Sequence, residues 1–225
     1  MGAFDVSDSP RRMPFLLDLY GRYLGDQDAI RFADSVRQFY LQGSLERLAS
    51  HPAREIRRAA VFTLGLVADY GANPVMGRAL CDEDRSVRRL ADQGIRLVWT
   101  RAGDETQRRR VMLLQQLNVT QRYREVVRKA TALVKKAAWF AEGWNQRAIA
   151  YFGLERFAES IGDCHQTLEI NPYHFPAAAG MGQAYLELGN HVSALEAFRR
   201  ALRLNPDMEP VRVQVARLAR LVEGK

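Results

Sequence analysis

Cysteine and histidine are scarce in this 225-residue chain, and their scarcity limits the chemistry that it can support. The two cysteines, Cys81 and Cys164, lie far apart in the sequence, and the four histidines do not have the spacing of metal ligands. We therefore expect neither a disulfide nor a metal site, and no cofactor. Both cysteines lie within helical patterns, which predicts small core residues of a protein kept in a reducing compartment.

Long apolar runs and catalytic motifs are also missing. Nowhere do 18 apolar residues follow one another, and residues 1–14 carry charges where a signal peptide would be apolar. Gly180-Met181-Gly182 lacks the third glycine and the preceding strand of a dinucleotide-binding loop, and no phosphate loop or serine elbow is present. These absences predict a cytoplasmic protein that is not an enzyme, does not cross a membrane and has no small-molecule substrate.

The excess of positive charge is confined to one segment. The chain carries 33 Lys and Arg against 26 Asp and Glu, and residues 105–140 hold nine basic residues against two acidic ones. A local excess of this kind indicates a basic surface patch rather than a chain that is basic throughout.

The C-terminal half contains the same 34-residue unit twice, at 141–174 and 175–208. A shift by 34 superposes Ala150 on Ala184, Tyr151 on Tyr185, Leu154 on Leu188, Leu168 on Leu202, Asn171 on Asn205 and Pro172 on Pro206. The spacing of apolar residues predicts two helices in each copy. Their inner faces can be buried only if successive copies stack on one another.

These copies resemble the tetratricopeptide repeat. The likeness rests on Trp144, Ala148, Tyr151, Leu168 and Pro172 in one copy and on Gly182, Tyr185, Ala194, Phe198, Ala201 and Pro206 in the next. The resemblance implies an array of helix pairs that holds other proteins, with a further, degenerate unit at 107–140.

A second, shorter repeat precedes the first. A shift by 31 superposes Ile56-Arg57-Arg58 on Val87-Arg88-Arg89 and Ala60 on Ala91. An acidic loop at 82–84 leads into the second copy, and the pattern is similar to the HEAT repeat. That resemblance implies that Arg57 and Arg88 bond to loop carboxylates of neighbouring units, with direct ligand contact as the alternative.

Together the repeats predict an all-α fold, an α-α superhelix (solenoid) of HEAT-like helix pairs that continue into tetratricopeptide helix pairs. The expected parts are an N-terminal segment 1–27, partly disordered, HEAT-like repeats 28–106, and a tetratricopeptide domain 107–225 with units 107–140, 141–174 and 175–208 and a capping helix 209–222. No Gly- or Ser-rich linker separates the two repeat types. We therefore expect them to share the helix at 111–117 and to form one continuous right-handed superhelix.

The apolar residues between positions 15 and 24 leave two alternatives open. They are Phe15, Leu16, Leu17, Leu19, Tyr20 and Leu24. They could form a short amphipathic helix that folds back onto the repeats, or a segment that binds a partner. Folding back is favoured because exposed apolar runs are costly in a free protein.

In tetratricopeptide arrays the first helix of each pair lines a concave groove, so the resemblance implies which residues would face a ligand. They are Arg108, Gln115, Asn145, Ile149, Phe152, Gln183 and Leu186. Amides can bond a peptide backbone and Phe152 can anchor a side chain, which predicts a scaffold or adaptor that binds a peptide or protein partner. The alternative is a groove that faces water or docks against the N-terminal segment of the same chain. Some family members clamp a C-terminal carboxylate with cations. The equivalent positions here are Val111, Gln115, Gln146, Pro176 and Gly180, and no such clamp is expected.

The alternative function is the binding of nucleic acid or another acidic partner through the basic patch of residues 108–136. Its members on one predicted helix are Arg122, Arg124, Arg128, Lys129, Lys135 and Lys136. Contacts to phosphates would give salt-dependent affinity, and Trp139 and Phe140 could stack on bases. A solvated outer helix face followed by two locally packed aromatic residues explains the same pattern and is favoured.

Overall fold

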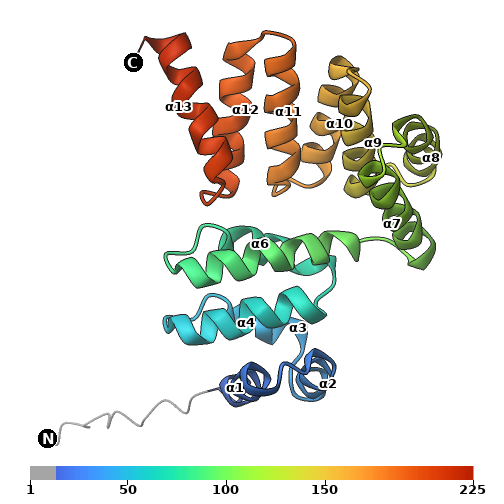
Figure 1. Ribbon diagram of the computed structural model, residues 1–225. Helices are drawn as coiled ribbons and strands as arrows, with labels where there is room; N and C mark the ends of the chain where they lie inside the picture. The colour runs from blue at the N-terminus through green and yellow to red at the C-terminus, as the bar shows by residue number, and fades with distance from the viewer. Residues whose placement is uncertain (1–13, 225) are drawn as a thin grey trace, which may run out of the picture.

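The computed structural model describes residues 14–224, and these residues form α-helices, one short 3-10 helix and no strand. The N-terminal helices are α1 (Leu16–Asp26), α2 (Ala29–Phe39), α3 (Gln42–Leu48), α4 (Arg54–Val67), α5 (Asn73–Ala79) and α6 (Arg85–Thr100), with the 3-10 turn at Tyr70–Ala72. The C-terminal helices are α7 (Glu105–Val119), α8 (Tyr123–Lys136), α9 (Ala141–Gly153), α10 (Phe157–Ile170), α11 (Phe175–Glu187), α12 (His191–Leu204) and α13 (Glu209–Glu223). The predicted all-α solenoid of stacked helix pairs is confirmed (Figure 1). Most of the segment expected to be partly disordered, residues 1–13, lies outside the described range.

The two sequence periods determine where the helices begin. In the N-terminal part, the shift by 31 carries the start of α3 onto that of α5 and the start of α4 onto that of α6. In the C-terminal part, the shift by 34 relates the starts of α9, α11 and α13, and likewise those of α8, α10 and α12. Each period therefore corresponds to one helix pair of the structure.

Side-chain caps define the starts of the two helices on either side of the junction between the parts. The Asp84 carboxylate accepts a hydrogen bond of 3.0 Å from the Val87 N–H at the start of α6. At α7, the Asp104 carboxylate accepts from the Gln107 N–H at 2.8 Å, and the Gln107 side chain accepts from the Asp104 N–H at 2.9 Å. This reciprocal capping box satisfies backbone donors that a helix start leaves without partners inside the helix.

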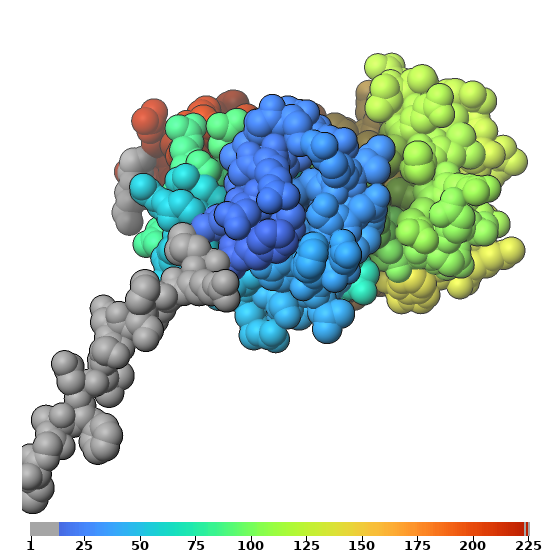
Figure 2. Space-filling model, turned by 90° about the horizontal axis from the view of Figure 1, so that it is seen from below, coloured from blue at the N-terminus to red at the C-terminus, as the bar shows by residue number. Residues whose placement is uncertain are grey.

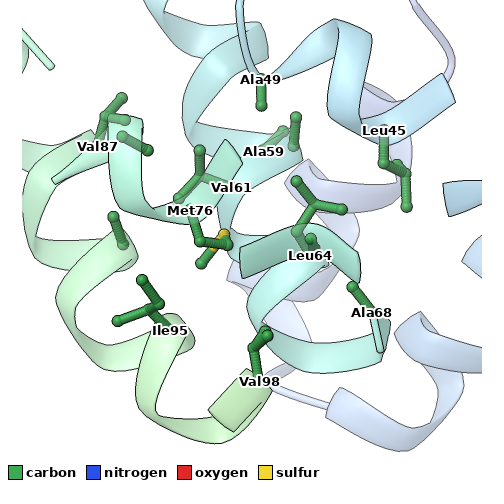
Figure 3. Close-up of a cluster of buried hydrophobic side chains, with 14 of the residues drawn as sticks. Leu45, Ala49, Ala59, Val61, Leu64, Ala68, Met76, Val87, Ile95 and Val98 are labelled. Carbon is green, nitrogen blue, oxygen red and sulfur yellow. The ribbon is translucent and has the colours of Figure 1, made fainter. Parts of the chain in front are cut away.

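The N-terminal core lies between α4, α5 and α6, whose apolar side chains converge on one another (Figure 3). Leu64, Met76 and Ile95 are completely buried there. The two longer helices approach closely at a pair of glycines, because a Cβ placed on Gly65 would lie 2.7 Å from the Cα of Gly94. A side chain at either glycine would force α4 and α6 apart.

The N-terminal segment packs against this core, as its apolar residues predict. Leu16 and Leu19 are buried, and α1 contacts α2 and α4. Seen from below, α1 and α2 cover this end of the molecule, while the yellow-green segment of α7 and α8 stands to one side (Figure 2). The segment therefore folds back onto the repeats, and it is not the free partner-binding segment of the alternative interpretation.

The C-terminal helices do not simply continue the N-terminal stack. In Figure 1, α6 crosses beneath the lower ends of α11, α12 and α13. Phe175 belongs to the N-terminal apolar cluster, and Tyr173, Leu204 and Met208 pack against the same cluster. The turns that join successive C-terminal helix pairs, residues 171–174 and 205–208, therefore lie on the surface of α5 and α6, together with Phe175 at the start of α11.

The expected shared helix is wrong. Helix α7 packs on α8 and α9, whereas α6 packs on α4, α5 and the two C-terminal turns. The chain changes direction at residues 101–104, where the Arg101 guanidinium donates to the carbonyls of Gly65 and Ala68 and ties the end of α6 to α4. The solenoid consequently folds back at this point instead of following one continuous superhelix.

The two cysteines differ in a way that the helical pattern did not predict. Cys164 is buried, and burial raises the pKa of its thiol to about 12. Cys81 is exposed in the turn after α5, so its assignment as a core residue is wrong. Its Sγ lies 3.4 Å from the carbonyl oxygen of Arg203.

Among residues 14–224, we find no helix with both the length and the apolar character that a membrane crossing requires.

Candidate functional site

A cavity of about 590 Å³ lies where the C-terminal half of α6 faces α9 and α11. Its lining comprises Arg96, Leu97, Trp99 and Thr100 from α6, Gln115 from α7, Glu142, Asn145, Gln146, Ala148, Ile149 and Phe152 from α9, Ser160 and Cys164 from α10, and His174, Pro176, Ala177, Gly180 and Gln183 at α11. Apolar and amide side chains predominate. A concave, mostly apolar site with a few convergent polar groups is typical of ligand-binding pockets.

Five of the seven residues that the sequence assigned to a groove line this cavity: Gln115, Asn145, Ile149, Phe152 and Gln183. Arg108 and Leu186 lie outside its lining. Leu186 packs, partly buried, against the C-terminal core, and the Arg108 guanidinium lies 3.8 Å from the Glu105 carboxylate. The stacking of α7, α9 and α11 thus brings together residues that are as far apart as positions 115 and 183.

The floor of the cavity is a buried pair, Glu142 and His174. Glu142 Oε1 lies 2.9 Å from His174 Nε2, and both side chains are almost completely buried. The other ring nitrogen of His174, Nδ1, accepts the Ala177 N–H at 3.1 Å as the cap of α11. Because Nδ1 accepts this backbone N–H, Nε2 is the nitrogen that donates to the Glu142 carboxylate.

Two amides complete the environment of this carboxylate. Gln146 Nε2 and Asn145 Nδ2 lie 3.3 and 3.4 Å from Glu142 Oε2. Burial acts to raise the pKa of Glu142, but the hydrogen bond from His174, the electrostatic interaction with the same ring and the hydrogen bonds from Gln146 and Asn145 outweigh burial and hold that pKa below its ordinary value. The cavity therefore contains a fixed negative charge at its floor.

Trp99 connects the floor to the N-terminal part. Its indole stacks on the His174 imidazole with ring centroids 4.3 Å apart, and its Nε1–H donates to Asn73 Oδ1 at 2.7 Å. Asn73 Nδ2 in turn donates to Asn171 Oδ1 at 2.9 Å. One network of hydrogen bonds and stacked rings thus joins α5, α6 and the turn before α11 beside the cavity.

Arg96 lies at the rim and is the lining residue with a permanent positive charge. Its guanidinium carbon is 4.8 Å from the centre of the Phe175 ring, a cation-π geometry. Its Nη2 lies 3.4 Å from Asp92 Oδ1, and half of its side-chain surface remains exposed.

The positions equivalent to a carboxylate clamp are reached by this cavity but carry no cation. Gln115, Gln146, Pro176 and Gly180 line it, whereas Val111 is buried in the core beneath α7. The positive charge that the cavity does contain comes from α6, on the opposite wall.

The basic patch occupies the outer face of α8, which buries Val126, Ala130, Leu133 and Val134 on its other side. Arg122, Arg124, Arg128, Lys135 and Lys136 are exposed, and Lys129 is partly exposed. Arg122 forms an ion pair with Glu125, and Lys129 Nζ lies 3.5 Å from the same carboxylate. Trp139 is exposed, but Phe140 is buried in the core between α7 and α9, so its suggested role in stacking on bases is wrong.

Sequence reasoning missed every residue that α6 contributes to the cavity. Arg96, Leu97, Trp99 and Thr100 reach the site only because the C-terminal turns dock on α5 and α6, through contacts between segments that are distant in the sequence. The repeated Asn171 and Asn205 were a usable signal, because a buried asparagine at equivalent turns requires a polar partner. That signal does not say which part of the chain supplies the partner.

Comparison with known proteins agrees with the geometry of the C-terminal helix pairs. Residues 177–208 match the family model of the tetratricopeptide repeat. The chain contains tetratricopeptide repeats. The HEAT-like character of the N-terminal pairs stays a prediction.

Among curated proteins, a tetratricopeptide repeat-containing protein of Rhizobium etli is 34% identical over 85 residues, which are 38% of this chain and 42% of that protein. Human Superkiller complex protein 3 is 30% identical over 82 residues, which are 36% of this chain and 5% of that protein. The matched stretch is thus less than half of the first relative and a small part of the second.

Among solved structures, the first tetratricopeptide domain of human RPAP3 superposes with a TM-score of 0.48 and 20% identity. The superposition covers 51% of this chain and 91% of that domain.

Proposed function

We propose that this chain is a non-catalytic interaction scaffold that binds a peptide segment of a protein partner in the cavity between α6, α9 and α11. One observation carries the proposal: five side chains chosen from the sequence as groove residues surround a single cavity large enough for a side chain and its backbone. The human relative is named as a protein of the superkiller complex, which supports a role in protein assemblies.

The chemistry of the lining fits a peptide. Ile149 and Leu97 are 45% and 49% exposed, so a ligand can bury apolar surface that now faces water. Gln115 and Gln183 line the same cavity and can exchange hydrogen bonds with a peptide backbone; Gln183 Nε2 donates to Glu187 at 3.0 Å, and its Oε1 can accept from a ligand. An apolar anchor together with backbone bonding is the usual basis of peptide recognition.

Affinity capture with the immobilised full chain tests the proposal. The double variant Ile149→Ala, Gln183→Ala removes an apolar contact and an amide from the lining. The double variant Met112→Ala, Gln116→Ala makes the same kinds of change at exposed positions of α7 that do not line the cavity. We expect the parent and the Met112, Gln116 variant to retrieve the same proteins, and the Ile149, Gln183 variant to fail to retrieve them. Nuclease treatment should not change either result.

Retrieval of the same proteins by all three would overturn the proposal. Retrieval that nuclease abolishes, and that Arg124→Ala, Arg128→Ala and Lys135→Ala remove, would instead assign binding to the basic patch. The midpoint of urea unfolding, measured for each variant, shows whether a lost interaction reflects lost folding.

A further inference from the structure

We propose that α6 selects the ligand: the cavity accepts one bulky apolar side chain of an internal peptide segment, while Arg96 pairs with an acidic side chain next to it. This inference rests on the proposed function, because it names the class of peptide that the same cavity binds. It assigns recognition to the N-terminal part as well as to the tetratricopeptide repeats.

The apolar subsite lies between two walls that belong to different parts of the chain. Leu97 on α6 and Ile149 on α9 are about half exposed, and the buried Ala148 and Ala177 line the same cavity. An inserted Leu, Met or Phe side chain would remove both exposed surfaces from water, which favours binding. Truncating either wall would weaken the same contact.

Arg96 is suited to bind a carboxylate at the rim. Its contacts within residues 14–224 are the Phe175 ring and one long approach to Asp92 Oδ1, at 3.4 Å. That same Asp92 oxygen accepts a shorter hydrogen bond, 2.9 Å, from Asn205 Nδ2. A guanidinium has five N–H donors in one plane, and stacking on Phe175 holds that plane while donors at its edge remain available to a ligand.

The arrangement of charge decides which part of the peptide enters. The Glu142 carboxylate at the floor repels a second carboxylate, so an acidic group is disfavoured inside the cavity and favoured near Arg96. Arg89, two turns before Arg96 on α6, is exposed and adds positive potential outside the cavity. An apolar residue inside with an acidic side chain outside satisfies both charges.

The same charges argue for an internal segment rather than a chain terminus. A C-terminal carboxylate that enters the cavity with its backbone meets the negative charge of Glu142, which belongs to the same lining. The positions from which a clamp would neutralise that carboxylate hold Gln115, Gln146, Pro176 and Gly180. A side-chain carboxylate can instead extend outward to Arg96.

A displayed library of random 12-residue peptides, each fused at its C-terminus, tests the inference with the full chain as bait. We expect peptides enriched on the parent to carry Leu, Ile, Met or Phe with Asp or Glu within two positions. On Arg96→Glu the acidic preference should change to Lys or Arg. Arg85→Glu, which makes the same change at the exposed start of α6 away from the cavity, should enrich the same peptides as the parent.

One enriched peptide, synthesised with a free and with an amidated C-terminus, then gives the affinity by calorimetry. We expect about a fivefold loss of affinity with Arg96→Gln, a value in the range of a half-exposed ion pair. The affinity for the parent should fall with added salt more steeply than the affinity for Arg96→Gln. Amidation should change nothing.

Three results would overturn the inference: enriched peptides without an acidic preference, an unchanged affinity in Arg96→Gln, or binding of the free-acid form alone. Failure of the proposed function gives a different result. In that case the enriched peptides would bind the Ile149→Ala, Gln183→Ala variant as tightly as the parent. Peptides whose binding depends on Ile149 but not on Arg96 would refute only the role of α6.

Discussion

Two arginines at equivalent positions of successive N-terminal helix pairs make the same local contacts and then bind different neighbours. Arg57 Nη1 donates to the carbonyls of His51 and Pro52 at 3.0 and 2.9 Å, and Arg88 Nη1 donates to those of Asp82 and Glu83 at 2.9 and 3.1 Å. Arg57 Nε and Nη2 bond in a bidentate manner to Asp82 of the next helix pair, at 2.8 and 3.0 Å, and Nη2 also donates to Glu83 at 2.9 Å. Arg88 Nε instead donates to Asp207, at 2.9 Å, in a turn of the C-terminal part.

The comparison shows what the stacking surface of a helix pair requires. The turn at 205–208 takes the place that the acidic loop of a further N-terminal pair would occupy. A carboxylate at the right position is sufficient, although the helices behind it follow a different repeat. Arg57 therefore confirms the predicted bond between neighbouring units, and Arg88 extends that bond to a unit of another kind.

The two junctions differ in the forces that hold them. Arg57 and Asp82 are 8% and 12% exposed, whereas Arg88 and Asp207 are 20% and 34% exposed. The second junction instead gains aromatic stacking, since Trp99 packs against His174 and Phe175. We infer that the first junction supplements its apolar core with two ion pairs, Arg57 with Asp82 and Arg58 with Asp84, whereas the second is supplemented by buried rings.

The largest effect is expected from Trp99→Ala, which removes the indole that packs against His174 and Phe175 at the second junction. The change also leaves Asn73 Oδ1 without the hydrogen bond that Trp99 Nε1 donates. A buried Trp-to-Ala change costs about 4 kcal/mol in the free energy of unfolding. Trp139→Ala removes the same side chain from a position that is 54% exposed and should cost little. Urea unfolding of both variants measures the difference, and equal midpoints would show that the rings do not hold this junction.

Arg57→Ala should destabilise the first junction by about 3 kcal/mol, because it leaves the Asp82 carboxylate buried without its cation. Arg88→Ala is the matched change at the second junction and should cost about 1 kcal/mol or less, as expected for a more exposed pair. Unfolding in urea at two salt concentrations separates the cases. Equal losses for the two variants would contradict the comparison.

A third effect, smaller than those of Trp99→Ala and Arg57→Ala, concerns pH and the Glu142 carboxylate beside the second junction. Because the folded-state pKa of Glu142 lies below its ordinary value, its hydrogen bonds contribute stability above a pH of about 4.5, and this contribution is lost as the pH falls through the folded-state pKa. Glu142→Gln should therefore be less stable than the parent by about 1.5 kcal/mol at neutral pH.

The gap between Glu142→Gln and the parent should narrow as the pH falls below 4.5. The exposed Glu169→Gln supplies the control for loss of a surface carboxylate. A gap that stays constant from neutral pH to pH 4 and below would mean that Glu142 titrates alike in the folded and unfolded chains.

The local part of this structure could be predicted from the sequence. The periods of the two repeats give the starts of the paired helices, and Asp104 with Gln107 gives the start of α7. Such features depend on neighbours within a few turns, so side-chain spacing is enough to reveal them. The same reasoning identified Asn145, Ile149 and Gln183, which the packing of successive first helices brings together.

The fold-back at residues 101–104 could not be predicted in this way. Whether the face of α6 meets another N-terminal pair or the turns of the C-terminal helices depends on the shape and polarity of both surfaces. The apolar pattern of α6 is the same in either case. Trp99 and Arg96 consequently read as an ordinary core residue and an ordinary surface residue of one helix, and their place beside His174 and Phe175 emerges only in three dimensions.

The contact of α6 with two successive turns also has a mechanical consequence. An open array of helix pairs can change its length through small rotations between neighbouring pairs. Here α6 crosses the ends of α11, α12 and α13 (Figure 1). These ends can separate only after Phe175 and Met208 have left the N-terminal cluster. The N-terminal part therefore restrains the curvature of the C-terminal helix pairs, and we expect these pairs to resist stretching more strongly than an open solenoid does.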